Sequence, residues 1–396
     1  MEIIIQKFGG TSVACNEKRK LVIDKIKKAI ENNYSPVVVV SAMGRKGDPY
    51  ATDTLLSLVH SNFKKKNAKA VDFLISCGEM ISSAVLCSEL EMQGIKAAPL
   101  TGGQAGIITD NSFNSASVKK VNEENLLKLL SQGIVPVVTG FQGVTEEGDI
   151  TTLGRGGSDT TASILGVALK AKEIEIYTDV DGIMTADPRI VNDAFVISNM
   201  SYNEVFQFAD QGAKVIHPRA VEAAMRGNIP LIIKNVLNES KGTIIDNSLE
   251  ESNKIITGIT HTSGRLQVIV KAMNNKNNIN YKHLLNILAD KHISIDLINV
   301  FPEEKIFTIN EEDKFNLIDT FKNLDIIFNF EDKCSKLAII GSGMKGVPGV
   351  MASILESLNN ENIEVLQTAD SYMTIWCLVK TENVERAINI LHKKFM

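Results

Sequence analysis

The sequence has few of the residues that mark several common classes of protein. Its 396 residues include no Cys-x-x-Cys pair and no histidines at a zinc-ligand spacing. We therefore expect reduced cysteines in packing positions and no metal site. The cysteines are Cys15, Cys77, Cys87, Cys334 and Cys377. The net charge of −5 gives no basic excess to neutralise a phosphate backbone, so nonspecific nucleic-acid binding is not expected.

Long apolar runs are also missing. No stretch reaches the roughly 18 apolar residues that a membrane-spanning helix needs. Residues 1–7 form a strand-like run, without the basic and then apolar segments of a signal peptide. With 44% hydrophobic and 22% charged residues, the composition is that of a soluble globular protein. These features predict a cytoplasmic protein with no membrane partner, and the length predicts two or three domains.

Two widespread phosphate-handling signatures do not occur. The sequence has no G-x-x-x-x-G-K-[ST] loop, and it has no H-R-D or D-F-G pair. A G-x-G-x-x-G pattern occurs at residues 341–346 after a strand-like run, but only 50 residues follow it. Because that length is too short for the second half of a dinucleotide-binding domain, we interpret the glycines as a loop.

The first 235 or so residues alternate short β-branched runs with helical patterns. The runs are apolar throughout, which suits strands buried on both faces of a parallel sheet. The expected strands are 3–5, 37–40, 134–139, 174–178 and 231–234, and the expected helices are 18–31, 160–171 and 221–226. This pattern predicts an α/β sandwich with a mostly parallel sheet, whose strand ends carry glycines, serines and threonines where ligands bind.

The composition of the sequence changes after Asn235. Residues 238–254 are polar and predict a linker. Beyond them, the pattern of residues 284–295 recurs at 354–365, an offset of 70 residues. This repeat predicts two copies of a small βαββαβ unit, the second closed by a helix at 384–393. The expected domains are 1–247, 257–331 and 334–396.

Four segments of the N-terminal region have the composition of ligand-binding loops. Residues 7–12, Lys-Phe-Gly-Gly-Thr-Ser, place a cation and two glycines directly after the first strand, where backbone N–H groups can approach a phosphate. Residues 152–161 place Arg155 among three glycines and several hydroxyls, which suits a carboxylate. Taken alone, these segments could equally be a tight turn and a solvated loop.

The other two segments are less specific. Residues 177–189 contain an Asp-x-Asp-Gly that resembles half of a calcium loop, but Pro188 stands where calcium would need a glutamate. A nucleotide-holding loop fits better, with a structural turn as the alternative. Residues 211–219 place Lys214 just before a helix, where a solvated surface lysine is the alternative.

Together the four segments resemble the aspartate kinases, members of the amino-acid kinase family. The segments 41–44 (Ser-Ala-Met-Gly), 77–79 (Cys-Gly-Glu), 154–160 and 178–182 follow in that family's order, and the C-terminal repeats resemble its paired ACT domains. Residues 44–53 resemble the diaminopimelate-sensitive subgroup. The resemblance implies an amino-acid kinase sandwich followed by two ACT-like regulatory domains.

The resemblance also implies a reaction and a set of roles. The γ-phosphoryl group of ATP would pass to the β-carboxylate of L-aspartate, with Mg²⁺ bridging the phosphates. Many relatives have an aromatic residue at the position of Met184, so a thioether contact with adenine is what this sequence allows. The expected catalytic residues are Lys7, Asp159 and Lys214. The expected aspartate-binding residues are Thr52, Glu79, Arg155 and Ser158. The expected ATP-binding residues are Lys7, Phe8, Gly9, Gly10, Ser41, Thr178, Asp179, Met184, Thr185, Ala186, Asp187, Pro188, Arg189 and Lys214.

The chemistry agrees with these residue types. A carboxylate nucleophile has a pKa near 4 and is already ionised at pH 7, so the reaction needs charge neutralisation rather than a general base. Two alternatives remain open. One is a non-catalytic amino-acid sensor that keeps the ACT pair, and the other is a related kinase acting on glutamate or acetylglutamate.

The ACT-like repeats predict an amino-acid effector and a homo-oligomer formed through them. In the first copy, Asp296 would pair with the effector's ammonium, while Asn280 and Asn299 lie in the expected neighbouring segments. We expect feedback by an end product of the pathway. Diaminopimelate, lysine and threonine all remain possible.

Overall fold

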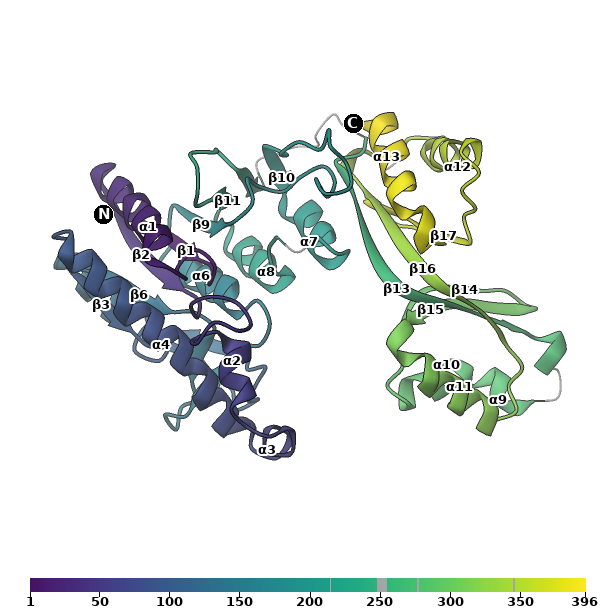
Figure 1. The fold of residues 1–396 in the computed structure, drawn as a ribbon, viewed down its shortest axis with the longest axis horizontal. Coiled ribbons are helices and arrows are strands. Elements are labelled where there is room, and N and C mark those ends of the chain that lie inside the picture. Colours follow the sequence, from purple (N-terminus) through teal and green to yellow (C-terminus); the bar gives the residue numbers. More distant parts are fainter. Residues whose placement is uncertain (214, 248–254, 276–277, 345) are drawn as a thin grey trace. The chain divides into compact units, whose positions relative to one another are not determined.

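The computed structural model describes residues 1–213, 215–247, 255–275, 278–344 and 346–396. The chain forms two compact units. The first unit comprises residues 1–183, 196–210 and 214–250, and the second comprises residues 184–195, 211–213 and 251–396. Figure 1 follows the chain through both.

An eight-stranded sheet forms the centre of the first unit, in the order β10-β12-β11-β9-β1-β2-β6-β3. All of its pairings are parallel except β11 with β12. Its strands are β1 (Glu2–Phe8), β2 (Tyr34–Val40), β3 (Ala97–Leu100), β6 (Val135–Thr139), β9 (Glu173–Thr178), β10 (Asn199–Ser201), β11 (Leu231–Asn235) and β12 (Thr243–Asp246). A second, four-stranded sheet contains β4 (Ile107–Thr109), β5 (Val118–Val121), β7 (Gln142–Val144) and β8 (Ile150–Thr152).

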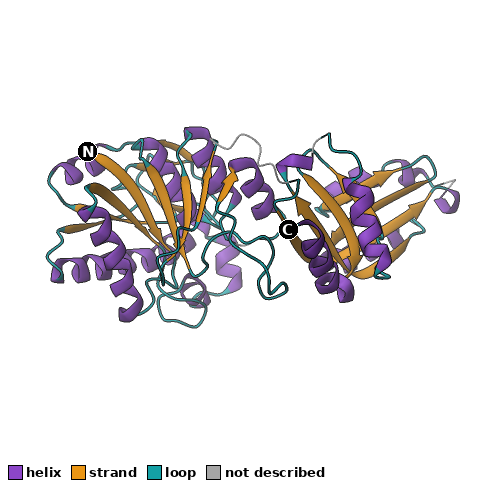
Figure 2. Ribbon diagram, turned by 90° about the horizontal axis from the view of Figure 1, so that it is seen from above, coloured by secondary structure: helices purple, strands orange, loops and turns teal. Residues whose placement is uncertain are grey.

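Helices cover both faces of the large sheet, as Figure 2 shows. The helices are α1 (Asn16–Glu31), α2 (Thr52–Ser57), α3 (Ser61–Lys66), α4 (Ala68–Met92), α5 (Glu124–Ser131), α6 (Gly157–Ala168), α7 (Tyr202–Asp210) and α8 (Pro218–Gly227). Side chains of α1 and α4 share one core with alternate residues of β1, β2 and β6. α6 packs on the opposite face of β1 and β9. The predicted α/β sandwich with a mostly parallel sheet is therefore confirmed.

One helix, α4, is long and apolar enough to cross a membrane by length and composition alone. It nevertheless carries Asp72 and Glu79, which are 0% and 2% exposed. The Asp72 carboxylate accepts hydrogen bonds from the backbone N–H of Asn114 and from both the N–H and the hydroxyl of Thr152. α4 is thus a core helix of the first unit, and Asp72 fixes it to the end of β8.

The expected linker at 238–254 is partly wrong. Its residues Thr243–Asp246 form β12, which pairs with β11 and β10 inside the large sheet. The alternation of buried Thr243 and Ile245 with more exposed neighbours explains the strand, because one side of β12 faces the interior. Residues 248–254 lie outside the described residues.

The second unit is built on one six-stranded antiparallel sheet, in the order β14-β15-β13-β16-β18-β17. Its strands are β13 (Gly258–Lys271), β14 (Ile295–Val300), β15 (Glu304–Asn310), β16 (Asn329–Ile340), β17 (Gln367–Asp370) and β18 (Thr374–Lys380). Its helices are α9 (Ile279–Lys282), α10 (Leu284–Asp290), α11 (Lys314–Asn323), α12 (Val350–Asn360) and α13 (Val384–Phe395).

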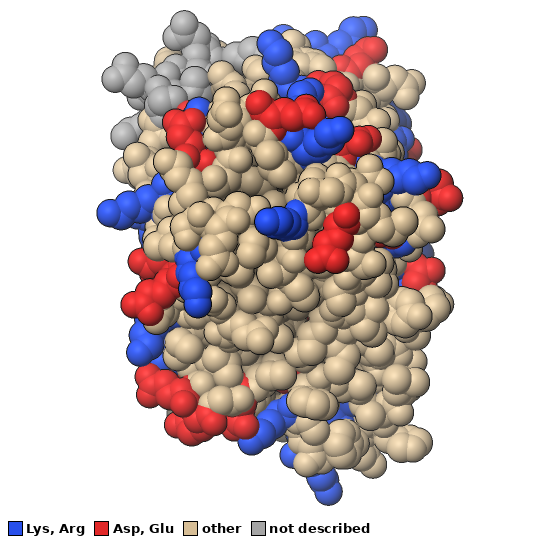
Figure 3. All heavy atoms as spheres, turned by 90° about the vertical axis from the view of Figure 1, so that its left-hand side faces the viewer, with Lys and Arg blue, Asp and Glu red and all other residues tan. Residues whose placement is uncertain are grey.

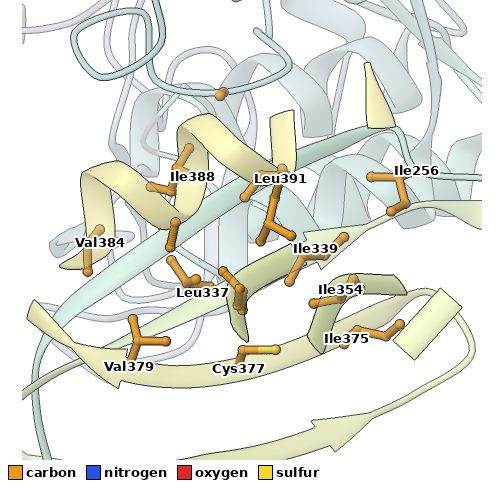
Figure 4. Close-up of a cluster of buried hydrophobic side chains, with 14 of the residues drawn as sticks. Ile256, Leu337, Ile339, Ile354, Ile375, Cys377, Val379, Val384, Ile388 and Leu391 are labelled. Atoms are coloured by element: carbon orange, nitrogen blue, oxygen red, sulfur yellow. The ribbon is translucent and has the colours of Figure 1, made fainter. Parts of the chain in front are cut away.

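Two hydrophobic cores divide this sheet. One contains the second half of β13 with α10 and α11. The other contains Ile256, which precedes β13, and Ile259 at the start of β13, together with β16, β18, α12 and α13 (Figure 4). The register of β13 against β16 shifts between Thr262 and Arg265, where the strand passes from one core to the other. The core formed mainly by the expected region 334–396 therefore also contains Ile259 from the expected region 257–331.

Charged side chains are mixed on the surface of the first unit. On the face drawn in Figure 3, lysines and arginines lie among aspartates and glutamates. Such mixing gives this face no extended field of one sign.

Asp72→Asn should lower the free energy of unfolding by about 1–3 kcal/mol, because the amide places an N–H₂ group against N–H and O–H donors and leaves buried groups unsatisfied. Urea denaturation would measure the change. Glu91→Gln, at an exposed position of the same helix, is the matched control and should change stability by less than about 0.5 kcal/mol. Equal effects of the two substitutions would contradict this account of α4.

Candidate active site

The candidate site forms where neighbouring parallel strands of the large sheet end. The segment after β2 is joined to β1 by a hydrogen bond from Ser41 N–H to the carbonyl of Phe8, 3.2 Å long. Gly140, just after β6, donates to the carbonyl of Val40. Gly9 N–H donates to Tyr177 at the end of β9. The glycine- and serine-rich segments predicted at separate strand ends therefore meet at one edge of the sheet.

A cation and a carboxylate pair at this edge. Lys7 at the end of β1 places its Nζ 2.6 Å from Oδ1 of Asp159, in the first turn of α6. Their side chains are 12% and 15% exposed. An ion pair this shielded from water is strong only with good geometry, which the close contact provides. The structure thus brings together two of the three residues expected to be catalytic.

Close backbone approach explains two of the glycines. A Cβ on Gly10 would lie 2.4 Å from the carbonyl oxygen of Ala42, so only glycine allows this packing of the two strand-end loops. Gly156 precedes α6 with φ of 68°, and a Cβ there would lie 2.2 Å from Cβ of His217. The N-termini of α6 and α8 therefore approach each other closely at the same edge.

The expected aspartate-binding residues come from three elements. Arg155 is exposed in the loop before α6 and makes no ion pair with any described residue. Ser158, in the first turn of α6, lies against Gly140. Thr52 begins α2, which packs against α4, the helix of Glu79.

Glu79 is a buried carboxyl with one free oxygen. Its Oε1 accepts a hydrogen bond of 3.1 Å from Ala42 N–H, and Oε2 has no partner among the described residues. Burial raises the pKa of Glu79 to about 8. Through Ala42, Glu79 adjoins Gly10 and hence the Lys7 strand end. A ligand ammonium beside Oε2 would supply the missing partner.

One residue of the loop after β9, Asp181, has a structural role. The carboxylate of Asp181 accepts hydrogen bonds from the side chains of Asn235 (2.6 Å) and Asn238 (2.7 Å), which lower its pKa. Asp181 therefore shapes the turn. Asp179, expected at the ATP site, forms an exposed ion pair of 2.7 Å with Arg45. Thr178 next to it is half-buried.

The rest of the expected ATP-binding segment, residues 184–189, belongs to the second unit. Thr185 is 1% exposed, and its hydroxyl hydrogen-bonds Nε2 of His392 on α13 at 2.8 Å. Ala186 is part of the core that α13 helps to form. The Asp187 carboxylate pairs with Arg189, whereas Pro188 is exposed and Met184 is half-buried. Lys214 lies outside the described residues.

The expected effector residues have separate partners. The Asp296 carboxylate lies 2.6 Å from Nζ of Lys336 and 3.4 Å from the guanidinium of Arg265. Asn299 accepts a hydrogen bond of 2.6 Å from Gln367. Asn280 donates to the carbonyl of Leu324, and no contact joins it to Asp296 among the described residues. The structure therefore does not bring these three residues together, and Asp296 already has two cationic partners.

Sequence reasoning missed the role of α4. Asp72, Ser76, Glu79 and Ser83 recur at helical spacing along it and are all buried. A polar stripe at that spacing inside an apolar helix is a signal for buried polar contacts, and it could have been read from the sequence.

The described residues contain no group of three or more histidines, cysteines, aspartates or glutamates that could hold an ion. At this edge Asp159 is paired with Lys7 and Asp179 with Arg45, while Oε2 of Glu79 has no partner among the described residues.

Comparisons with known proteins agree with this geometry. Residues 2–235 match the model of the amino acid kinase family, and residues 329–393 match an ACT domain model. The chain is 42% identical over 405 residues to aspartokinase 1 of Bacillus subtilis (strain 168), covering 100% of this chain and 99% of that protein. It is 36% identical over 404 residues to the aspartokinase of Geobacillus stearothermophilus, covering 100% and 97%.

Solved structures show the same fold. The structure of E. coli aspartokinase III in complex with aspartate and ADP matches with a TM-score of 0.77 and 24% identity, covering 99% of both chains. The aspartate kinase of Clostridium acetobutylicum matches with a TM-score of 0.81 and 23% identity, covering 100% of both chains.

Glu79→Gln should raise the free energy of unfolding at pH 8 by an amount on the order of a few kcal/mol, and should raise it little at pH 5. In the unfolded chain the carboxyl loses its proton near its ordinary pKa of 4.5, but in the folded chain it keeps the proton up to about 8. Stability of the wild type therefore falls as pH rises between these values, and glutamine removes that loss.

Urea denaturation at both pH values would measure the difference, with Glu91→Gln as the exposed control on the same helix. A gain of the same size at pH 5 and pH 8 would show that Glu79 is ionised in the folded protein.

Proposed function

The chain belongs to the aspartokinases of the amino acid kinase family, and from this premise we propose how its residues share the work of the reaction. An aspartokinase transfers the γ-phosphoryl group of ATP to the β-carboxylate of L-aspartate, giving 4-phospho-L-aspartate and ADP. That transfer is the first step in making lysine, threonine and methionine. Two observations support our assignment: the shielded Lys7–Asp159 pair, and the unpartnered Oε2 of Glu79, whose other oxygen accepts from Ala42 N–H.

Charge neutralisation is the main task of the protein in this transfer. The attacking β-carboxylate is already ionised at pH 7 and needs no base, but it must approach phosphate oxygens that are also negative. Lys7 supplies positive charge at the strand end, and Asp159 holds its ammonium in place at 2.6 Å. Lys214 would supply a second cation. The Gly10 N–H of the β1–α1 loop would add a donor for a phosphate oxygen, whereas the Gly9 N–H already donates to Tyr177.

The α-ammonium and the α-carboxylate of aspartate need partners of opposite charge. The unpartnered Oε2 of Glu79 would accept hydrogen bonds from the α-ammonium, which would also favour the ionised form of that carboxyl. Arg155 is exposed and free of ion pairs among the described residues, so its guanidinium can bind the α-carboxylate through two N–H groups. Thr52 and Ser158 would complete the contacts with their hydroxyls.

ATP would bind beside the same strand ends. Phe8, Gly9, Gly10, Ser41, Thr178 and Asp179 supply backbone and hydroxyl groups there. The segment 184–189 belongs to the second unit, so its contacts with the nucleotide stay a prediction from the resemblance, and within it the side chains of Thr185 and Ala186 are buried. Mg²⁺ would arrive with ATP, held by its phosphate oxygens, and no step proposed here passes through it.

Regulation would act through the second unit. We infer that an end-product amino acid binds the ACT region, that the chain forms a homo-oligomer, and that it works in the cytoplasm. Asp296 is a poor choice for testing the effector site. Its removal would leave buried Lys336 and half-buried Arg265 without their carboxylate, and would therefore destabilise the sheet.

Lys7→Ala should lower kcat by about 10²–10³, because a cation is lost from the shielded phosphoryl site. A coupled assay of ADP release would measure kcat, and circular dichroism melting would show that the fold is retained. The control is Lys27→Ala, an exposed position on α1 that should keep wild-type kcat. Activity of the Lys7 variant within a factor of about three of wild type would remove Lys7 from the mechanism.

Arg155→Ala should raise the KM for aspartate by about tenfold or more and leave the KM for ATP nearly unchanged, because a bidentate partner of the substrate carboxylate is lost. Arg155→Lys should restore little, since an ammonium cannot make the paired hydrogen bonds. Arg226→Ala, on the exposed face of α8, is the control. A rise in the KM for ATP alone would assign Arg155 to the nucleotide instead.

A further inference from the structure

The first unit contains a cavity of about 370 Å³ on the α1 side of the large sheet. Its floor is formed by β1, β9, β11 and β12, and its rim by α1 and residues 238–241. None of the residues assigned above to aspartate or ATP lines it. Nothing in the proposed reaction uses this cavity.

The strand that crosses the floor is unusually polar for a parallel sheet. On β9, Glu173 and Glu175 alternate with buried Ile174 and Ile176 and face the cavity. Strands of such sheets are commonly apolar on both faces. Like-charge repulsion and burial raise the pKa of Glu173, with burial the larger cause. This face therefore holds two carboxylates that the packing of the sheet does not require.

Most charges around the cavity are paired. Glu175 contacts Lys234, and it also accepts hydrogen bonds from Gln6 Nε2 (2.8 Å) and the hydroxyl of Tyr177 (3.1 Å). On the rim, Lys25 and Lys28 share one carboxylate, that of Glu239.

Two opposite charges are left over. Glu173 on the floor and Lys241 on the rim make no ion pair with any described residue. The amide oxygen of Gln6 is also unsatisfied, although Gln6 is only 1% exposed and lines the floor. A buried acceptor without a donor has lost the hydrogen bonds that water gives it in the unfolded chain, and a ligand donor would restore one. The cavity thus offers acceptors at its floor and a free cation at its rim.

Aliphatic side chains also line the cavity. Ile232 and the 38% exposed Ile244 lie on adjacent strands of the floor. We propose that this cavity binds a free amino acid with an aliphatic side chain. Its ammonium pairs with Glu173 and donates to the Gln6 amide oxygen, its carboxylate pairs with Lys241, and its side chain lies on Ile232 and Ile244.

L-Norleucine is a suitable probe, because it has both charges and an unbranched chain. Isothermal titration calorimetry on the full chain would measure its binding beside that of hexanoate, which lacks the ammonium, and pentylamine, which lacks the carboxylate. We expect saturable norleucine binding below about 10 mM, and binding at least tenfold weaker for both analogues. Glu173→Gln and Lys241→Met should each weaken norleucine binding by about fivefold or more.

Two controls locate the ligand. Lys27→Met, on α1 but outside the cavity, should bind norleucine like the wild type. Arg155→Ala should also bind normally, since Arg155 does not line the cavity. Glu173 and Lys241 are not core residues, so melting temperatures should stay near wild type.

Three results would overturn the proposal. One is no norleucine binding at about 10 mM. Another is hexanoate binding as tightly as norleucine, which would mean an anion site only. The third is binding lost in Arg155→Ala but kept in Glu173→Gln and Lys241→Met, which would place the ligand at the candidate active site.

Discussion

The Lys7–Asp159 ion pair depends on the parallel pairing of β1 with β9 in the large sheet. Parallel strands carry their carboxyl ends to the same edge, so the end of β1 and the start of the helix leading into β9 meet there. An unpaired Lys7 at 12% exposure would lose hydration without compensation, and Asp159 supplies the compensating charge. The other candidate site residues take their places from this same edge.

Much of the site could be predicted because its signals are local. Lysine and two glycines directly after a strand describe a backbone geometry within a few residues, and Gly10 has the close approach that such a motif requires. The contacts of Asp72 with Asn114 and Thr152 join distant parts of the chain, and nothing near Asp72 in the sequence identifies its partners. The strand β12 was missed for a similar reason, since its short polar-flanked run becomes a strand only beside β11.

The second unit shows a further limit of pattern reasoning. The 70-residue repeat led to the prediction of two similar parts, and the structure joins both stretches in one six-stranded sheet. The repeat could not indicate that β13 contributes to both cores, because a long strand has the same sequence pattern whether one core or two pack against it. The register shift near Arg265 is the physical sign of the change. Packing against α13 on one side and α11 on the other decides the division.

Residues 184–195 leave the first unit and pack into the core of the second. The chain leaves the first unit after Ile183, and the Ile197 N–H donates to the Ile183 carbonyl where the chain returns. Within residues 184–195, the Thr185 N–H donates to the carbonyl of Phe195. Thr185 is also held by His392, and the side chain of Asn389 donates to the carbonyl of Ile190, so α13 fixes this loop at two points. An effector can change activity only by binding two states of the protein unequally. Because Ala186 and Val191 of this loop share a core with α13, a ligand that repacks that core would act on the loop as well.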